Sequence, residues 1–282
     1  MELTKEQLDF YAEFIEKNLG IIYKSDNHYQ LQRRLQQVAI QLGFDDVVAM
    51  HEALQNGIFG HAKTLILDIA TNNETLFFRD KKIFDGFQKH ILSSADYLDG
   101  TKPVTIWCAA CSTGQEPYSL AMILDEFTKA DPRRSYRIFA TDFSDRVLDV
   151  ARKGEYTQLE VQRGLKTKQL IKYFEKTADA SKDTWQIKPS LQKQIEFDQL
   201  NLLAPWPHVE SFDFIFCRNV LIYFEVDVKK KIIEKLYSKL NPGGYLVLGA
   251  AESLVGLSDS YVPVKLGEAN YYQKADSVQK TA

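Results

Sequence analysis

Two cysteines and one glycine stand close together in the stretch WCAACSTGQEPYS (residues 107–119). Cys108 and Cys111 have the C-x-x-C spacing of a dithiol redox centre. Gly114 follows small polar residues and precedes a Glu-Pro pair that suits the first turn of a helix. The backbone N–H groups of such a strand-to-helix turn can hold a cofactor, so the stretch is compatible with two kinds of chemistry.

The redox interpretation requires an exposed C-x-x-C at a helix N-terminus, where the helix dipole lowers the thiol pKa. Cys108 instead lies at the end of an apolar run that predicts a buried strand. A zinc site is also disfavoured, because only Cys217 and five histidines remain, at no recognisable ligand spacing. We therefore interpret Cys108 and Cys111 as small core residues and predict no metal site.

An acid at the end of the next apolar run favours a cofactor. The run YRIFATD ends in Thr141-Asp142, and a carboxylate after a second strand suits both hydroxyls of a ribose. The same acid suits the N-terminus of a helix beginning near Ser144, so both interpretations stay open. The chain has no lysine-bearing phosphate loop and little glycine to approach a pyrophosphate. This disfavours ATP and NAD and favours a nucleoside without phosphates, with S-adenosylmethionine as the obvious candidate.

Composition narrows the class of protein. The chain has 282 residues, 45% hydrophobic and 26% charged, as in an ordinary globular protein large enough for two domains. A net charge of -3 and the lack of a long basic stripe argue against a nucleic-acid substrate. We find no signal peptide and no apolar run of membrane-spanning length, and three cysteines make a poor disulfide framework. We expect a cytoplasmic protein without direct membrane insertion.

Hydrophobic periodicity predicts two parts. Residues 1–72 read as helices throughout, the first beginning with a capping box at Thr4 and the last covering 63–70. From about Thr101, short runs rich in β-branched and aromatic residues alternate with helical segments, which predicts a doubly wound α/β domain. Such a domain binds its ligand at the carboxyl ends of the strands. The alternation lapses over 155–197, which we interpret as an insertion at the edge of the sheet.

Six sequence blocks follow one another along nearly the whole chain. They are TNNETLFFRD (71–80), CSTGQEPYSLA (111–121), ATDFSDRVLDVARKGEY (140–156), QLNLL (199–203), FDFIFCRNVLIYF (212–224) and LNPGGYLVLGAAESL (240–254). Together and in this order, they resemble the CheR-type chemotaxis receptor methyltransferases, which methylate glutamates on bacterial chemoreceptors. Any one block alone would be a weak signal.

The resemblance implies a small all-helical N-terminal domain followed by a Rossmann-like S-adenosylmethionine methyltransferase domain. It places a helical substrate-recognition domain at 1–72 and a linker and helix that contribute to the cofactor site at 73–100. The methyltransferase domain would span 101–282, with a small inserted antiparallel β-subdomain at about 156–196. The implied reaction is methyl esterification of glutamate side chains on the cytoplasmic domains of chemoreceptors, in chemotactic adaptation, with S-adenosylhomocysteine as product.

The resemblance also implies which residues form the site. The cofactor contacts would be Asn73, Thr75, Arg79, Glu116, Asp142, Asn201, Leu202, Arg218 and Asn219. Asp142 would bind the ribose, and Asn201 and Leu202 would lie beside the adenine. The implied catalytic residues are Arg79, which would orient the acceptor carboxylate, and Tyr223, which would place a ring near the sulfonium.

The predicted second helix is notable for its charge. Residues 28–44 include no acidic residue. With Leu31 and Leu35 inward, helical geometry places Arg33 and Arg34 on an opposing polar face. This face is either an ordinary solvated surface or a cationic docking surface for acidic receptor helices, where charge would mainly raise the association rate.

Two other functions remain open at this stage. One is a methyltransferase with another acceptor, such as a small molecule, a nucleic acid or a different protein. The other is a regulatory module that binds S-adenosylmethionine or its demethylated product without turnover. The presence of Arg79, Asn219 and Tyr223 argues against the second.

Overall fold

The structure, a computed structural model, describes residues 2–94, 97, 100–177 and 183–275. The chain divides into two compact units. The first consists of the residues up to Asn72 together with Asn201–Leu203 and Tyr223–Lys229, and the second consists of the remaining residues. Among the described residues, no helix combines the length and the apolar character needed to cross a membrane.

The first unit is built from helices, as the sequence predicts. They are α1 (Lys5–Leu19), α2 (His28–Gln41), α3 (Val47–Leu54) and α4 (Gly60–Ala70). The predicted capping box is confirmed: the Thr4 hydroxyl accepts from the Gln7 N–H, and the Gln7 side chain accepts from the Thr4 N–H. The Asp46 carboxylate caps α3, and α4 begins three residues earlier than its apolar pattern suggests.

The structure corrects the expectation that Arg33 and Arg34 share one exposed face. Arg33 is exposed, but Arg34 is half-buried. Its Nη1 donates to the carbonyl oxygens of Ile69 (3.1 Å) and Ala70 (2.8 Å) and also to the Tyr23 hydroxyl (2.6 Å). Carbonyls in the last turn of a helix lack helical N–H partners, and a cation there also suits the helix dipole. Arg34 therefore caps the C-terminus of α4.

The second unit contains a seven-stranded sheet. Its strands, in spatial order, are β6 (Ile195–Gln199), β2 (Tyr136–Asp142), β1 (Val104–Ala109), β7 (Phe212–Phe216), β8 (Leu240–Val247), β10 (Ala269–Lys274) and β9 (Tyr261–Leu266). The first five are parallel, and β10 and β9 extend the sheet with antiparallel pairing. The chain order reverses between β1 and β7, which is the position where an α/β sheet opens its ligand crevice.

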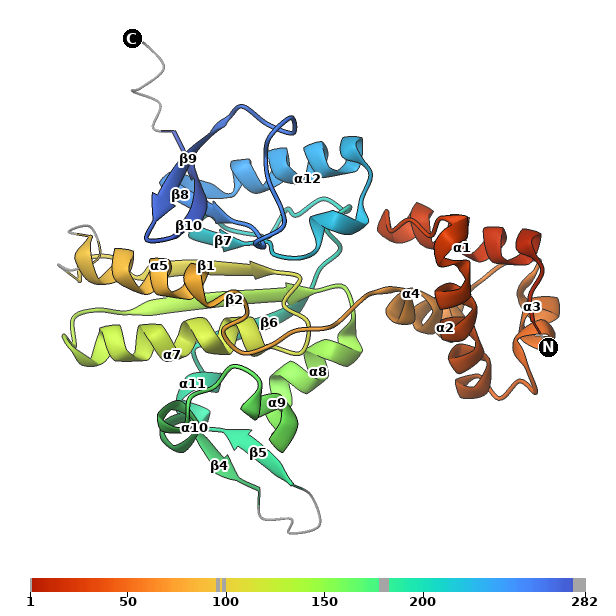
Figure 1. Ribbon diagram of the computed structural model, residues 1–282, viewed down its shortest axis with the longest axis horizontal. Coiled ribbons are helices and arrows are strands. Elements are labelled where there is room, and N and C mark those ends of the chain that lie inside the picture. The colour runs from red at the N-terminus through yellow and green to blue at the C-terminus, as the bar shows by residue number, and fades with distance from the viewer. Residues whose placement is uncertain (1, 95–96, 98–99, 178–182, 276–282) are drawn as a thin grey trace. The chain divides into compact units, whose positions relative to one another are not determined.

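Helices α5 (Lys81–Ser93), α7 (Gln115–Lys129), α8 (Asp145–Lys153) and α12 (Val226–Ser238) complete the α/β pattern. Figure 1 shows α5 and α7 side by side along the sheet, where they pack against each other. The ring of Phe87 on α5 meets that of Phe214 on β7 edge-on at 5.0 Å, within the main core cluster. The predicted doubly wound α/β fold is confirmed.

The irregular stretch forms a small antiparallel sheet of its own. It contains β3 (Glu155–Thr157), α9 (Gln158–Gln162), α10 (Thr167–Tyr173), β4 (Phe174–Lys176), β5 (Thr184–Ile187) and α11 (Pro189–Gln192), with strand order β3-β5-β4. The ring of Phe77 joins it to the rest of the unit, with edge contacts to Tyr156 (5.1 Å) and Phe174 (5.6 Å). The predicted inserted β-subdomain is thus present, and the chain re-enters the main sheet at Ile195.

Arg34→Met should destabilise the first unit, because it leaves the last carbonyls of α4 without their charged donor. We expect a loss of about 1–3 kcal/mol in the free energy of unfolding. Arg33→Met is the matched control and should change it by about 0.5 kcal/mol or less. Denaturant unfolding followed by circular dichroism measures the effect, and equal losses in the two variants would contradict the capping role. All three tryptophans lie in the second unit, so their fluorescence provides an internal reference.

Candidate functional site

The carboxyl ends of β1, β2 and β7 bring the candidate residues of the second unit together. These strands are parallel neighbours, so the residues that follow them meet at one edge of the sheet. Ser112 follows β1, Asp142 ends β2, and Arg218 and Asn219 follow β7. The edge includes the place where the strand order reverses.

The Asp142 carboxylate is held in a defined orientation at this edge. It accepts from the backbone N–H of Ser112 at 2.9 Å and from that of Ser144 at 3.1 Å, and the residue is only 7% exposed. The N-cap of α8 is Ser144, whose hydroxyl accepts from the Val147 N–H at 3.2 Å. The side chain that caps α8 is therefore that of Ser144, so Asp142 is not needed for that task.

Backbone strain is concentrated around the same edge. In the described part of the chain, the non-glycine residues with positive φ are Phe78, Asp80, Ala110, Ser112 and Asn219. Their φ angles lie between 52° and 66°, a region that side-chain-bearing residues rarely adopt. All of them belong to the loops after β1 and β7 or to the segment 73–80. Such strain persists only where the surroundings hold it, and it is typical of functional sites.

Three hydrogen bonds hold the segment 73–80 at this edge. The Ser112 hydroxyl donates to the Asn73 carbonyl at 2.8 Å, and the Phe78 N–H donates to the Ser119 hydroxyl at 2.9 Å. Nη2 of Arg218 donates to the Arg79 carbonyl at 2.7 Å. The candidate residues of this segment, including the half-buried Thr75, are therefore fixed relative to β1, α7 and β7.

A buried guanidinium forms the centre of the arrangement. Nη1 of Arg218 donates to Glu116 Oε2 at 2.7 Å, and Nη2 donates to Asp80 Oδ2 at 2.8 Å. Arg218 is 7% exposed and Glu116 is 8% exposed. Burial raises the pKa of the Glu116 carboxyl, and the adjacent Arg218 guanidinium opposes that shift. These residues contact each other, so the structure places Glu116 and Arg218 as an internal bridge at the edge.

Arg79 has a different environment. It is half-buried, and among the described residues its guanidinium makes one hydrogen bond, from Nη1 to the Glu74 carbonyl at 3.0 Å. A guanidinium has five N–H donors in a planar fork that matches a carboxylate. Arg79 therefore retains donors for a ligand, whereas Nη1 and Nη2 of the neighbouring Arg218 both donate to groups within the protein.

The positive φ of Asn219 depends on a residue that the sequence reasoning missed. Glu252 Oε2 accepts from the N–H of Asn219 at 2.7 Å and from that of Gly249 at 2.8 Å. A side chain at position 249 would lie 2.6 Å from Nδ2 of Asn219, so the turn requires glycine there. Asp80 was also missed. Both acids lie inside the sequence blocks quoted above. Glu252 is the single charged residue of its block, which was an available signal, whereas Asp80 lies among other charged residues and gave none.

The remaining candidates belong to the first unit. Nδ2 of Asn201 donates to the Asn18 carbonyl at 2.9 Å, and Leu202 is buried beside it in the chain. The Tyr223 hydroxyl accepts from Nδ2 of Asn72 at 2.9 Å. Asn201, Leu202 and Tyr223 are thus held by the helical unit, whereas the other candidate cofactor contacts lie in the second unit.

The cysteines are buried and free, as the interpretation of them as core residues predicts. Burial raises the pKa of the Cys108 and Cys111 thiols well above the usual value, which disfavours the reactive thiolate. Cys217 has the same character. Within the described ranges, no three His, Cys, Asp or Glu side chains are grouped as metal ligands.

The polar groups at the edge suit a nucleoside cofactor. Asp142 is the type of residue that binds ribose hydroxyls, and it ends the strand next to the central one. A carboxylate offers about four acceptor positions, so its backbone contacts do not prevent it from accepting further hydrogen bonds. Glu116, Asp80 and Glu252 add acidic character, which suits a positively charged sulfonium.

Comparison with known proteins identifies the family that this chain resembles. Residues 73–269 match the family described as CheR methyltransferase, SAM binding domain. Chemotaxis protein methyltransferase 1 of Pseudomonas aeruginosa is 36% identical, over 97% of this chain and 99% of its own length. Chemotaxis protein methyltransferase Cher2 of Pseudomonas putida is also 36% identical, over 96% of this chain and 99% of its own length. Among solved structures, N-methyltransferase NodS of Bradyrhizobium japonicum, in complex with S-adenosylhomocysteine, matches with a TM-score of 0.42 and 14% identity, over 73% of this chain and 94% of that one.

The family match covers the strained edge, the segment 73–80 and the buried guanidinium, and the relatives align with both compact units. The cofactor is S-adenosylmethionine, as the sequence predicts. The chain belongs to the CheR methyltransferase family, whose members are S-adenosylmethionine-dependent enzymes.

Proposed function

We propose that this protein transfers a methyl group from S-adenosylmethionine to glutamate side chains on the cytoplasmic domains of chemoreceptors. The observation that carries the proposal is the likeness to chemotaxis protein methyltransferases over nearly the full length of both chains. A likeness that includes the helical unit supports a shared acceptor as well as a shared cofactor.

The proposed acceptor simplifies the chemistry. A glutamate side chain has a pKa of about 4.3, so at neutral pH it is already the nucleophilic carboxylate and no general base is required. When bound, the cofactor supplies a methyl group on a positively charged sulfur. The protein must therefore place a carboxylate oxygen in line with the S–CH₃ bond, and such orientation contributes about 7–11 kcal/mol at its favourable limit.

The residues of the second unit divide into two proposed roles. Asp142 binds the ribose hydroxyls, and Asn73, Thr75 and Asn219 contribute further polar contacts to the cofactor. Arg218 and Glu116 act mainly as positioning residues, because their charged atoms are engaged with each other and with the segment 73–80. Asn201 and Leu202, from the helical unit, contribute beside the adenine.

Arg79 and Tyr223 are the proposed contacts of the reacting groups. The donors that Arg79 retains can bind one face of the acceptor carboxylate and orient it. The Tyr223 ring can stabilise the sulfonium, because an aromatic face attracts a cation. Attack joins opposite charges, so a site that excludes water favours the reaction.

The helical unit is the proposed receptor-recognition domain. Arg33 on α2 is exposed, and 28–44 contains no acid that would neutralise it. It is therefore suited to dock acidic receptor helices, mainly by raising the association rate. We do not assign Arg34 to receptor docking, because its guanidinium donates to the last carbonyls of α4.

Incubation with methyl-labelled S-adenosylmethionine and a receptor cytoplasmic fragment should label the fragment with an alkali-labile ester. Arg79→Ala should lower kcat/KM by about a hundredfold or more, because the acceptor loses its orientation. Calorimetry with S-adenosylhomocysteine should show a much smaller change in affinity. Arg79→Lys should retain more activity, as a cation without the planar fork. An alkali-stable product, or cofactor binding without turnover in the unaltered protein, would contradict the proposal.

Arg218→Met should act on the fold as well as on activity. The substitution leaves the buried Glu116 carboxyl and Asp80 without their cation. Breaking such a pair should lower the free energy of unfolding by about 3–5 kcal/mol. Arg79→Met is the matched control and should cost about 1 kcal/mol or less. Tryptophan fluorescence during denaturant unfolding reports on the second unit. Equal stability of the two variants would rule out the positioning role.

Arg33→Glu should reduce receptor methylation by about two- to tenfold at low ionic strength, because it reverses the charge that attracts the acceptor. The difference should disappear as salt is added. Lys63→Glu, an exposed substitution on α4 with the same change in charge, serves as control. A salt-independent rate in the unaltered protein, or equal effects of the two variants, would remove the docking role.

A further inference from the structure

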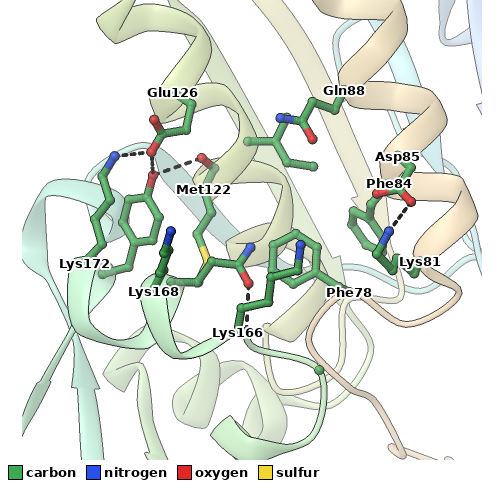
Figure 2. Close-up of a pocket in the computed structure, with 14 residues that line it drawn as sticks. Phe78, Lys81, Phe84, Asp85, Gln88, Met122, Glu126, Lys166, Lys168 and Lys172 are labelled. Atoms are coloured by element: carbon green, nitrogen blue, oxygen red, sulfur yellow. Dashed lines mark hydrogen bonds and ion pairs between the residues drawn. The ribbon is translucent and has the colours of Figure 1, made fainter.

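A cavity of about 360 Å³ lies in the second unit, and none of the candidate site residues lines it. Figure 2 shows its walls, with α5 on the right, α10 on the left and α7 behind. Its volume falls within the range of small-molecule pockets, about 300–1,000 Å³. The loop before α10 packs closely against the segment 73–80, since a Cβ at Gly164 would lie 1.9 Å from the Phe77 carbonyl oxygen.

The charged side chains of the cavity leave a surplus of positive charge. They are Lys81, Lys166, Lys168, Lys172, Asp85 and Glu126. Lys81 pairs with Asp85, and Lys172 pairs with Glu126. Lys166 and Lys168 form no ion pair with any residue that the structure describes, and Figure 2 shows both on the wall formed by α10. The cavity therefore suits an anion.

The number and type of the unpaired cations suit a phosphate group. Every cation that lines the cavity in the described part of the chain is a lysine. A lysine ammonium binds phosphate as a point charge, and a surplus of two such charges matches a phosphate monoester, which carries a charge of about −1.5 to −2 at pH 7. Lys166 precedes α10 and Lys168 lies in its first turn, and both are exposed, so their flexible side chains can turn toward an anion at the cavity.

The remaining lining is apolar and aromatic. Phe78 and Phe84 meet edge-on with ring centroids 5.3 Å apart, and Met122 and Ile123 of α7 lie alongside. Gln88 adds an amide that can both donate and accept. An apolar surface with rings, a polarisable sulfur and one amide suits a flat heteroaromatic body.

This cavity is connected to the cofactor edge through shared side chains. The Phe84 ring lies 5.4 Å from the Arg218 guanidinium, so the same ring lines the cavity and supports the buried cation. Phe78, whose φ is 52°, directly precedes Arg79 in the chain. An occupant would therefore contact residues that hold the strained segment 73–80.

We propose that this cavity binds a phosphorylated aromatic small molecule, of which a nucleoside monophosphate is the simplest type. The phosphate contacts Lys166 and Lys168, and the base lies against Phe78, Phe84 and Met122. This cavity is separate from the cofactor site. A metabolite bound in it can therefore influence the cofactor site through the side chains that the two share.

The test is calorimetric titration of the full chain with a panel of ribonucleoside monophosphates. The chain is first saturated with S-adenosylhomocysteine, so that the cofactor site cannot take up the probe. At least one monophosphate should bind saturably at one site. The variant Lys166→Gln/Lys168→Gln should weaken that binding by about tenfold or more. The control variant Lys230→Gln/Lys231→Gln, with the same charge change at exposed positions of α12, should bind as the unaltered protein does.

Two further probes separate the parts of the ligand. The matching nucleoside and inorganic phosphate should each bind at least about tenfold more weakly than the monophosphate, because each lacks one half of the contacts. The proposal is overturned if no monophosphate binds, if inorganic phosphate binds as tightly, or if the two double variants behave alike. Unchanged circular dichroism and unfolding midpoints in the variants show that a loss of binding does not reflect unfolding.

Discussion

The buried Arg218 guanidinium is the interaction on which the site depends. It joins Glu116 of α7 to Asp80 and the Arg79 carbonyl, so one side chain connects the sheet edge, a helix and the segment 73–80. Removing charges from water is costly, and it is offset only when each charge finds a partner with good geometry. Here one cation meets two carboxylates and a carbonyl at 2.7–2.8 Å. This requirement holds the segment 73–80 in one position. It uses the carbonyl of Arg79 but not its guanidinium, which keeps donors for a ligand.

The strained backbone follows from that constraint. Phe78 and Asp80 adopt positive φ on either side of Arg79, and Asn219 does so after β7. Each is held by a separate contact: the Ser119 hydroxyl, the Arg218 guanidinium and the Glu252 carboxylate. The strain is thus balanced locally by hydrogen bonds that are partly shielded from solvent. This local balance explains why small hydroxyl and acidic residues accompany the more obvious candidates in these segments.

Local sequence patterns predicted the helices and the buried strands, but they did not predict which side chains pair with residues distant in sequence. The β-branched runs correctly indicated β1, β2, β7 and β8, because strands buried on both faces leave a continuous apolar signal. The antiparallel pair β9 and β10 was missed, since its exposed residues break that signal. Arg34 was placed on the solvent face because helical spacing does not reveal that the end of α4 lies within reach. Asp80 and Glu252 were overlooked for the same reason: their partners are distant in sequence.

The account rests on the claim that the carboxyl edge of β1, β2 and β7 cradles S-adenosylmethionine in the arrangement that Arg218 maintains. A crystal structure of the chain with S-adenosylhomocysteine tests it most directly. The account predicts the Asp142 carboxylate about 3 Å from the ribose hydroxyls, with Arg218 still joined to Glu116 and Asp80 and with Arg79 on the side of the sulfur. A nucleoside bound away from this edge, or one that Asp142 does not touch, would contradict it.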